Sequence, residues 1–450
     1  MKLDDNIKKQ IQDIYDNTDD NIHSVSLGFK YKNNIKTDEI SIIYRVSEKK
    51  SLTDIPKDSI IPSEIKIGEK IIKTDVIQEN PCVLVACYGD INQYRGTATD
   101  PEITRIRTPS TPYRGGMEIQ KHPRGYVSSG GFVYLSMGTL GFFARDNIDG
   151  KVVGVTNSHV LIHKRLFANE RYLNQTELNN PYNTIEASAS VYGTFVPGSV
   201  TSTSNSGFHV SSTYIKRYQP ISSSVTNYID CALIIPNSSY IDANSYRVWQ
   251  PSTNNTYPTS LPFASTSEID NLLVTNPKLY STGRTTGPKG YDNVSSCNLV
   301  IDSVGGSSNT GNEDGTTTPP VYADLIYYKY QDGGYNPIYS GDSGSALLAD
   351  IGGVRKIIGL SFAGAGLLVN GVTQFVTAIA CRIDRVASLM NISAFTTPHD
   401  AAYPPSTSIN TTSITTSNIS KYGDKASIVI NGKTYYQSGL TYNPNVSSIN

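Results

Sequence analysis

The chain has 450 residues, in which 38 Lys and Arg residues nearly balance 39 Asp and Glu residues. This balance offers no electrostatic basis for binding nucleic acid or an acidic membrane surface, so we expect neither as a partner. The length allows two or three domains. A composition with 17% charged residues and 30 Tyr predicts many strands joined by polar loops rather than a helical bundle.

The cysteines are scattered along the chain, and their odd number does not suggest a disulfide framework. No two of them have the spacing of zinc ligands, and nothing in the sequence requires a metal or a cofactor. We therefore predict no cofactor, and reduced, mostly buried thiols at Cys82, Cys87, Cys231, Cys297 and Cys381.

The first residues alternate charged and apolar side chains, without the uninterrupted apolar run of a signal peptide. No apolar stretch approaches the length that is needed to span a bilayer. These features predict a soluble protein without a signal peptide. They leave open whether the protein is cytoplasmic or virion-associated.

Charge is concentrated at the start of the chain, where residues 1–80 hold 13 Lys or Arg and 15 Asp or Glu. Alternating β-branched and aromatic residues predict strands at 23–34, 39–49 and 70–78. Apolar residues at helical spacing predict an amphipathic helix before them, with an apolar face made of Leu3, Ile7, Ile11 and Ile14. We interpret residues 1–80 as a small α+β leader domain.

An extended connector follows at 81–125, with several Gly, Pro and Arg residues and little periodicity. From residue 126 onward, short strands with turn signals between them predict a barrel or sandwich architecture. We divide this part into a first β-barrel at 126–262, with a polar insertion at 181–227, and a second β-barrel at 263–395.

The composition changes again after the second predicted barrel. Ser and Thr supply ten of the residues at 401–420, which is typical of a linker. We therefore predict a Ser/Thr-rich linker at 396–420 and a short β-like tail at 421–450. Such a tail is suited to docking on a larger assembly, for instance a phage virion.

Ser343 stands in the sequence Gly341-Asp342-Ser343-Gly344, directly before an apolar strand. A serine hydroxyl is a weak nucleophile, which needs a base to take its proton and donors for the oxyanion that forms. Gly341 can take a conformation that turns its N–H inward, beside the N–H of Ser343. We expect Asp342 to be a buried acid that holds the turn in shape through a charged or polar partner. The alternative is a plain turn between two strands.

One of the six histidines, His159, lies at the end of a predicted strand and the start of a helical stretch. Such a turn can project the imidazole into a cleft while the backbone is held rigidly, so His159 is the candidate general base. The alternative is a surface or structurally satisfied histidine. His163 lies one helical turn further on, and His23 and His399 fall outside the predicted barrels.

Asp230 is a lone acid before the apolar run 231–235, where an unpaired charge would be costly. A buried carboxylate is the group that fixes the tautomer of a catalytic imidazole. The alternative is an exposed acid at a strand edge, and Asp242 is the second choice. His159, Asp230 and Ser343 follow one another at intervals of 71 and 113 residues, in the chain order of the chymotrypsin type.

The three blocks around these residues, at 156–160, 230–234 and 341–345, resemble those of bacterial trypsin-like serine peptidases. The segment 283–287 resembles a signature of the bacterial and phage branch that is related to the plant NARROW LEAF1 protein, whose members often carry a small leader domain. The resemblance covers roughly residues 5–395. It implies a mainly β fold, with a chymotrypsin-like double β-barrel after the leader domain.

The resemblance also implies roles for single residues. The backbone N–H groups of Gly341 and Ser343 would form the oxyanion hole. Ser361 would lie beside Asp230, and Phe362–Ala363 would form the edge strand to which substrate is added. Ser361, Phe362 and Ala363 are therefore the expected substrate-binding residues, and a substrate would pair with them as an extra β-strand.

No acid stands in the segment 336–339, just before the Gly-Asp-Ser-Gly turn, which favours an apolar or uncharged substrate residue over Arg or Lys. The leading hypothesis is a serine endopeptidase that acts on polypeptides, with His159 as general base, Asp230 as orienting acid and Ser343 as nucleophile. Two alternatives stay open. One is a peptidase-fold structural or attachment protein, and the other is a module that binds extended peptides without cutting them.

Overall fold

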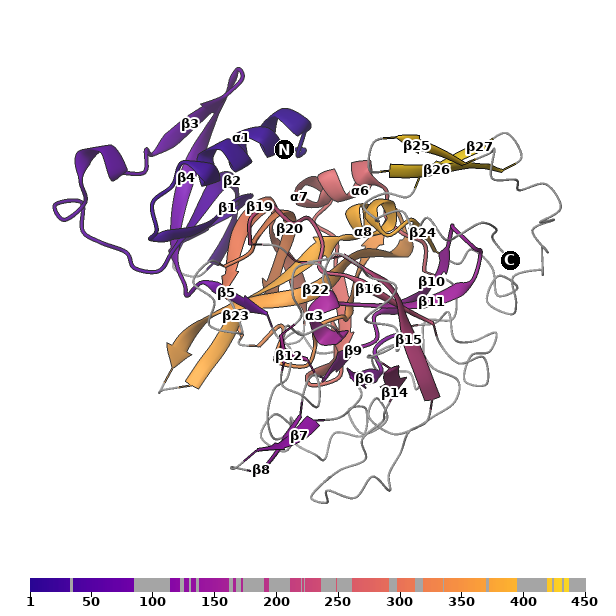
Figure 1. Ribbon diagram of the computed structural model, residues 1–450. Coiled ribbons are helices and arrows are strands. Elements are labelled where there is room, and N and C mark those ends of the chain that lie inside the picture. The colour runs from indigo at the N-terminus through magenta and orange to yellow at the C-terminus, as the bar shows by residue number, and fades with distance from the viewer. Residues whose placement is uncertain are drawn as a thin grey trace.

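A computed structural model of the chain shows a mainly β protein with few helices (Figure 1). Several sequence predictions fall outside the described residues, among them His163, Asp242, His399 and most of the connector, the polar insertion and the linker. The described residues are 1–32, 35–84, 114–121, 125–128, 131–134, 137–161, 165–166, 171–172, 190–193, 211–219, 221, 223–235, 248, 261–290, 298–311, 319–334, 336–369, 372–394, 419–422, 425–430 and 433–436.

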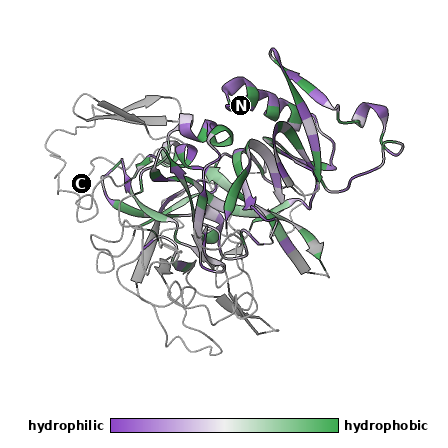
Figure 2. Ribbon diagram, turned by 180° about the vertical axis from the view of Figure 1, so that it is seen from behind, coloured by the Kyte–Doolittle hydropathy of each residue, from purple (hydrophilic) through white to green (hydrophobic). Residues whose placement is uncertain are grey.

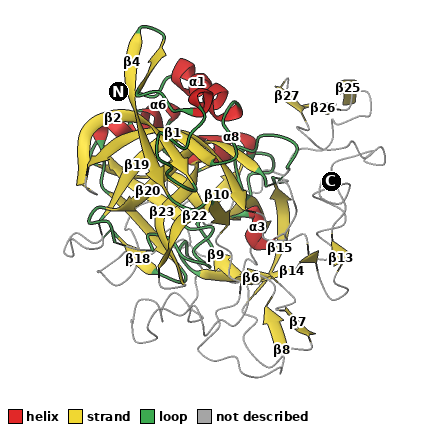
Figure 3. Ribbon diagram, turned by 90° about the vertical axis from the view of Figure 1, so that its left-hand side faces the viewer, coloured by secondary structure: helices red, strands yellow, loops and turns green. Residues whose placement is uncertain are grey.

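The described helices are short apart from the first, and none of them is long and apolar enough to cross a membrane. Figure 3 shows α1, α6 and α8 near one another at one end of the molecule. The helix bounds are α1 Asp5–Asp16, α3 Ser158–Leu161, α6 Thr266–Asp270, α7 Leu272–Thr275 and α8 Ile383–Leu389, with a 3-10 turn, η1, at Lys57–Ser59.

The predicted opening helix is confirmed as α1. The Asp4 side chain caps it by accepting a hydrogen bond of 2.9 Å from the N–H of Ile7. Leu3, Ile7 and Ile11 are buried against β1 and β19. Burial of each such side chain stabilises the fold by about 1.5–3 kcal/mol, so this face attaches the helix to the sheet.

Twelve strands form one continuous sheet. Six of them, in the order β17, β21, β22, β23, β20 and β19, close into a ring because β19 also pairs with β17, at Leu299 and Leu279. The twelve strands are β1 Ile22–Lys32, β2 Ile35–Val46, β3 Glu64–Ile67, β4 Lys70–Gln78, β5 Cys82–Leu84, β17 Leu279–Gly283, β18 Gly287–Lys289, β19 Leu299–Gly311, β20 Val321–Tyr330, β21 Ala346–Ile351, β22 Val354–Val369 and β23 Val372–Arg382.

The strands of the first 80 residues continue the sheet outward from the ring. β1 pairs antiparallel with β19, and β2, β4 and β3 follow in that order. The strands predicted at 23–34, 39–49 and 70–78 correspond to β1, β2 and β4, while β3 was not predicted. The leader is therefore attached to the ring by a shared row of backbone hydrogen bonds.

A buried cluster of charges strengthens this attachment. The Arg45 guanidinium from β2 forms ion pairs with Asp302 of β19 and, at 2.8 Å, with Glu79. Lys329 of β20 lies 2.9 Å from the other oxygen of Asp302, and Thr377 of β23 donates to Glu79 at 3.1 Å. Removal of one member of a buried ion pair commonly costs about 3–5 kcal/mol, so the cluster holds leader and ring in one arrangement.

A second sheet has eight strands, in the order β24, β10, β11, β16, β15, β14, β6 and β9. Its strands are β6 Glu118–Lys121, β9 Met137–Thr139, β10 Phe142–Asp146, β11 Val152–Thr156, β14 Ser190–Gly193, β15 Ser211–Tyr218, β16 Ala232–Ile235 and β24 Ile392–Ser393. Three small sheets hold the other strands: β7 Gly125–Ser128 with β8 Gly131–Tyr134, β12 Arg165–Leu166 with β13 Arg171–Tyr172, and β25 Ile419–Tyr422 with β26 Lys425–Ile430 and β27 Lys433–Tyr436.

Apolar residues are concentrated in the central strands, whereas hydrophilic residues are frequent in the leader (Figure 2). This agrees with the high charge density of residues 1–80 in the sequence. The described cysteines Cys82, Cys231 and Cys381 are free and buried, as the sequence predicted. Cys87 and Cys297 lie outside the described residues.

We expect His23 to make the stability of the fold depend on pH. Its side chain is 1% exposed, and Nε2 lies 2.8 Å from the Glu79 carbonyl oxygen. Burial lowers the pKa of His23 to about 4, while the Glu79 carbonyl opposes this shift and Arg45 adds to it. As the pH falls from about 6.5 toward 4, the unfolded chain takes up a proton that the folded chain does not.

The free energy of unfolding should therefore fall over this range by on the order of 3 kcal/mol. Urea denaturation of the wild-type chain and of His23→Gln at several pH values measures this dependence. The Gln variant keeps an amide donor for the Glu79 carbonyl but does not titrate, so its stability should depend less on pH. An equal change in the free energy of unfolding with pH in the two proteins would contradict this account.

Candidate active site

Ser343 lies in the turn that precedes β21, between two glycines with positive φ. Gly341 has φ +98° and Gly344 has φ +92°, in the region that favours glycine. A Cβ atom at Gly344 would lie 2.1 Å from the carbonyl oxygen of Thr139 on β9. The N–H of Thr139 in turn donates to the Ser343 carbonyl at 2.7 Å, so the second sheet packs directly on this turn.

The structure brings His159, Asp230 and Ser343 together in one hydrogen-bonded line. Nε2 of His159 lies 2.9 Å from the Ser343 Oγ, and Nδ1 is hydrogen-bonded to an Asp230 carboxylate oxygen. The other oxygen of Asp230 accepts the backbone N–H of His159 at 3.1 Å. All three side chains are buried. When Nδ1 donates to Asp230, Nε2 of the neutral imidazole is left as an acceptor for the serine proton.

Local chain geometry explains how these residues meet. His159 belongs to the short helix α3, which starts directly after β11, as the sequence predicted. Asp230 precedes β16, and β16 pairs with β11 through Ala232 and Thr156. Asn157, between β11 and α3, donates from its side chain to the Asp230 carbonyl at 2.6 Å. Neighbouring strand ends therefore place the imidazole and the carboxylate side by side.

Two buried thiols lie close to Asp230. The Asp230 N–H points to the Cys381 Sγ at 3.3 Å, and Cys231 is the next residue in the chain. Burial raises the pKa of both thiols, and the charge of Asp230 raises it further. Both thiols are therefore neutral near pH 7, and they give Asp230 an apolar setting in which its bond to His159 is strong.

The Asp342 carboxylate is the buried acid that holds the serine turn. It accepts the backbone N–H groups of Thr285, at 2.9 Å, Thr286, at 3.0 Å, and Tyr339, at 3.0 Å. It also accepts the Thr286 hydroxyl at 2.6 Å, and the Lys289 ammonium lies 3.2 Å away. Burial lowers the pKa of Lys289, whereas the Asp342 carboxylate opposes this shift. The segment 283–287 thus supplies most of the expected partners.

Two carbonyl groups of the turn accept hydrogen bonds that fix the orientation of the peptide planes before Gly341 and Ser343. The carbonyl of Ser340 accepts the Thr285 hydroxyl at 2.7 Å, and the carbonyl of Asp342 accepts the Ser345 N–H at 3.0 Å. In a trans peptide the N–H points away from the preceding carbonyl. The N–H groups of Gly341 and Ser343 are therefore directed away from Thr285 and Ser345, respectively.

Ser361, Phe362 and Ala363 lie in β22, whose Ser361 carbonyl accepts the Gly344 N–H of the serine turn at 2.9 Å. The Ser361 hydroxyl is hydrogen-bonded to the Tyr328 hydroxyl at 2.9 Å. Successive side chains of a strand point to opposite faces, and that of Ser361 points into the ring toward β20. It is the Phe362 carbonyl that meets the site, where it accepts the Ser343 hydroxyl at 3.2 Å.

An apolar wall that the sequence did not indicate stands next to Phe362. A Cβ atom at Gly364 would lie 2.7 Å from the Phe375 ring and 2.9 Å from the Ile338 side chain. The rings of Phe375 and Tyr339 meet edge to face, with centroids 5.8 Å apart. Phe375 comes from β23, and only the tertiary structure brings that strand to the segment before Ser343.

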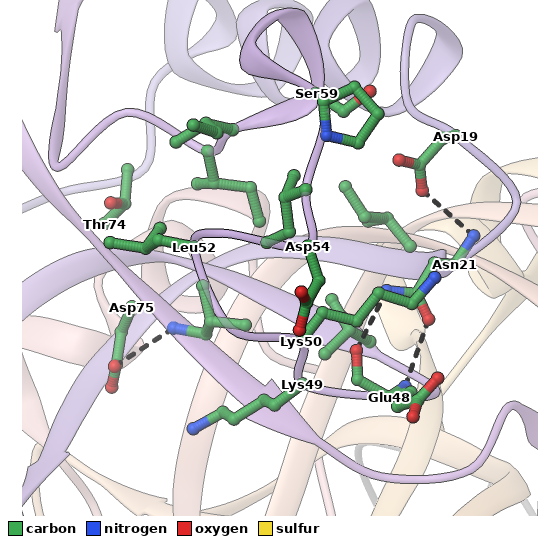
Figure 4. Close-up of a pocket in the computed structure, with 17 residues that line it drawn as sticks. Asp19, Asn21, Glu48, Lys49, Lys50, Leu52, Asp54, Ser59, Thr74 and Asp75 are labelled. Carbon is green, nitrogen blue, oxygen red and sulfur yellow. Dashed lines mark hydrogen bonds between the residues drawn. The ribbon is translucent and has the colours of Figure 1, made fainter.

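The leader contains a separate pocket of about 480 Å³ (Figure 4). Its lining residues all lie between Asp19 and Val76 in the sequence, so the pocket shares no residue with the hydrogen-bonded group of His159, Asp230 and Ser343. The Asn21 side chain braces its rim through two bonds of 3.0 Å to the backbone of Glu48. Among the described residues, no group of three or more His, Cys, Asp or Glu side chains is placed to hold a metal ion.

No family model matches the chain, and no curated protein sequence matches it. Several solved structures do, and they are trypsin- or chymotrypsin-like serine proteases. Nocardiopsis protease is 14% identical, with 57% of this chain and 92% of that chain covered and a TM-score of 0.33. Thermobifida fusca protease A is 13% identical, with 63% of this chain and 99% of that chain covered and a TM-score of 0.34. Cellulomonas bogoriensis chymotrypsin is 14% identical, with 64% of this chain and 100% of that chain covered and a TM-score of 0.34.

We expect Asp342→Asn to destabilise the fold more than Lys289→Met. The Asn variant leaves the Lys289 ammonium, which is 2% exposed, without its counter-charge, at a cost of about 3–5 kcal/mol. The Met variant leaves a carboxylate that still accepts three N–H groups and one hydroxyl, so its cost should be about 1–2 kcal/mol. Urea denaturation at pH 7 measures both, and the reverse order would contradict the assigned role of Asp342.

Proposed function

We propose that the chain is a serine endopeptidase of the chymotrypsin type, which cleaves polypeptides through an acyl-enzyme. The observation that carries the proposal is the series of hydrogen bonds from Asp230 through His159 to Ser343, in which His159 Nε2 lies 2.9 Å from Ser343 Oγ. A nucleophile, a base and a buried orienting acid at hydrogen-bond distance form the arrangement that activates a serine.

The chemistry follows from these contacts. Ser343 Oγ attacks the carbonyl carbon of the substrate while His159 Nε2 takes the hydroxyl proton, and Asp230 stabilises the imidazolium that forms. The N–H groups of Gly341 and Ser343 stabilise the oxyanion. The tetrahedral intermediate then releases the amine, which takes the proton from Nε2. Water, activated by the same nitrogen, hydrolyses the ester and regenerates Ser343.

We place the chain in the bacterial and phage branch related to the plant NARROW LEAF1 protein, because its segment 283–287 has a defined task here, to hold Asp342. In this proposal residues 126–262 and 263–395 form the two barrels, behind the leader at 1–80 and the connector at 81–125. The Ser/Thr-rich linker leads to a tail that docks on a larger assembly, and the separate sheet β25–β27 fits such a module.

Substrate specificity is proposed to favour an apolar residue before the cleaved bond. Ile338, Gly364 and Phe375 form an apolar wall beside Phe362, whose carbonyl accepts from Ser343. Burial of an apolar side chain against such a wall is favourable, whereas an unpaired Arg or Lys would lose its hydration there.

Labelling with a fluorophosphonate tests the proposed function directly. The native chain should be labelled, and Ser343→Ala should not be. Ser361→Ala is the matched control, since the Ser361 hydroxyl is bonded to Tyr328, and this variant should still be labelled. Asp230→Asn should lower kcat for peptide hydrolysis by about 10⁴, because His159 loses its orienting acceptor. A folded native chain that is not labelled would favour a structural or peptide-binding role.

Cleavage of a peptide library tests the proposed specificity. We expect apolar residues to dominate before the cleaved bond, and Phe375→Ala to shift the preference toward larger apolar residues because it removes a ring from the wall. Phe375→Leu keeps most of the volume and serves as the control. A dominant preference for Arg or Lys in the native protein would contradict the proposal.

A further inference from the structure

Strand β22 has an edge that the ring leaves unpaired beyond Ser361. On one side β22 pairs with β23 from Gly359 to Val369. On the other side its pairing with β21 reaches only Leu360, followed by the bond between the Gly344 N–H and the Ser361 carbonyl, 2.9 Å long. The backbone after Ser361 on this side is where an extended substrate would be added as a strand.

Strand β5 of this same chain already lies on that edge. Leu84 pairs antiparallel with Ala363, and Val83 pairs with Gly364. Upstream of β5, the Asn80 N–H donates to the Gly366 carbonyl at 2.9 Å. In Figure 1 the indigo strand β5 lies beside the orange strands of the ring. From residue 80 to residue 84, the chain therefore follows β22 step by step.

β5 runs toward Ser343, in the direction in which a bound substrate strand would approach this residue. Because β5 is antiparallel to β22, it runs from Gly364 toward Ala363, and the next residue of β22 is Phe362. The Phe362 carbonyl accepts the Ser343 hydroxyl at 3.2 Å. Leu84 of β5 is thus paired with Ala363, the residue of β22 next to Phe362.

β5 is also held from its other side. It pairs in parallel with the end of β19, where Cys82 is opposite Thr310. The buried Cys82 thiol lies 3.2 Å from the Ser308 hydroxyl. Three residues earlier, Glu79 belongs to the buried charge cluster of Arg45. β5 is therefore held against the ring by its pairing with β19 and by the leader residues that precede it.

We propose that β5 is an intramolecular occupant of the substrate-binding edge, through which the leader inhibits the peptidase in cis. The inference rests on the function proposed above. The backbone groups of Ala363 and Gly364 that face β5 cannot serve a second strand at the same time. A tethered strand competes at an effective concentration in the millimolar range, so a substrate must displace it. Such competition raises KM for extended peptides and leaves kcat unchanged.

A pair of variants tests this by loosening β5. In an antiparallel ladder, neighbouring residues face their partner strand alternately, so the N–H of either Val83 or Leu84 serves β22. The double variant Val83→Pro/Leu84→Pro removes both N–H groups. We expect its KM for an extended chromogenic peptide to be at least about 5-fold lower than that of the native chain, and its kcat to stay within about 2-fold of the native value. The control Val83→Ala/Leu84→Ala keeps both N–H groups and should change KM less than about 2-fold.

A second variant fixes β5 in place. Leu84 and Ala363 are directly opposite each other, at a separation that a disulfide can span. The oxidised double variant Leu84→Cys/Ala363→Cys should lose at least about 10-fold in peptide hydrolysis relative to its reduced form. Each single Cys variant should be insensitive to reductant. This comparison within one protein remains decisive if the proline variant does not fold.

Fluorophosphonate labelling separates the two proposals, because the small probe needs Ser343 but not the strand edge. A native chain that is not labelled overturns the proposed function and this inference with it. If the native chain is labelled, but the proline variant keeps the native KM and the oxidised cysteine variant cuts as fast as the reduced one, the inference fails and the proposed function stands. Lower KM in the first or redox-dependent cleavage in the second supports it.

Discussion

The Asp342 carboxylate lies at the centre of the serine turn, and the geometry of the site depends on it. It gathers N–H groups from both sides, from Tyr339 in its own loop and from Thr285 and Thr286 after β17. A buried carboxylate with this many donors and a lysine partner is costly to displace, so the turn has one arrangement. That arrangement fixes the directions of the Gly341 and Ser343 N–H groups, and in the proposed function these groups stabilise the oxyanion.

The leader is joined to the ring by strand pairing and ion pairs as well as through the chain. Its strands share a sheet with the ring, and Arg45 joins β2 to Asp302 of β19 and to Glu79. This attachment has a consequence for the site, because the chain that follows Glu79 is delivered onto β22. The ion pair between Arg45 and Glu79 therefore lies only three residues before β5.

Strand β22 combines three tasks along one stretch of backbone. Ser361 packs into the ring through Tyr328, Phe362 meets the Ser343 hydroxyl, and Ala363 and Gly364 carry the strand β5. The alternation of strand side chains separates the inward from the outward residues, and the bulge between Ser361 and Ala363 shifts the register there. A single strand thus contacts the interior of the ring, the Ser343 hydroxyl and β5.

Much of this protein could be predicted from local sequence patterns. The apolar spacing of the first residues is sufficient for α1, because an amphipathic helix is determined by side chains three and four positions apart. The short β patterns predicted a mainly β fold. His159, Asp230 and Ser343 were singled out because a strand-to-helix turn, a lone acid before an apolar run and a Gly-Asp-Ser-Gly turn are each visible within a few residues.

Other features were decided only by the tertiary structure. The partner of Ser361, the apolar wall at Phe375 and the continuation of the leader into the ring all depend on which distant strands become neighbours. Strand register is set by the packing of both faces and by bulges, and a shift of one residue exchanges inward for outward side chains. For the same reason, the short segment Cys82–Leu84 carries little signal by itself. Its place on β22 follows from the sheet that surrounds it.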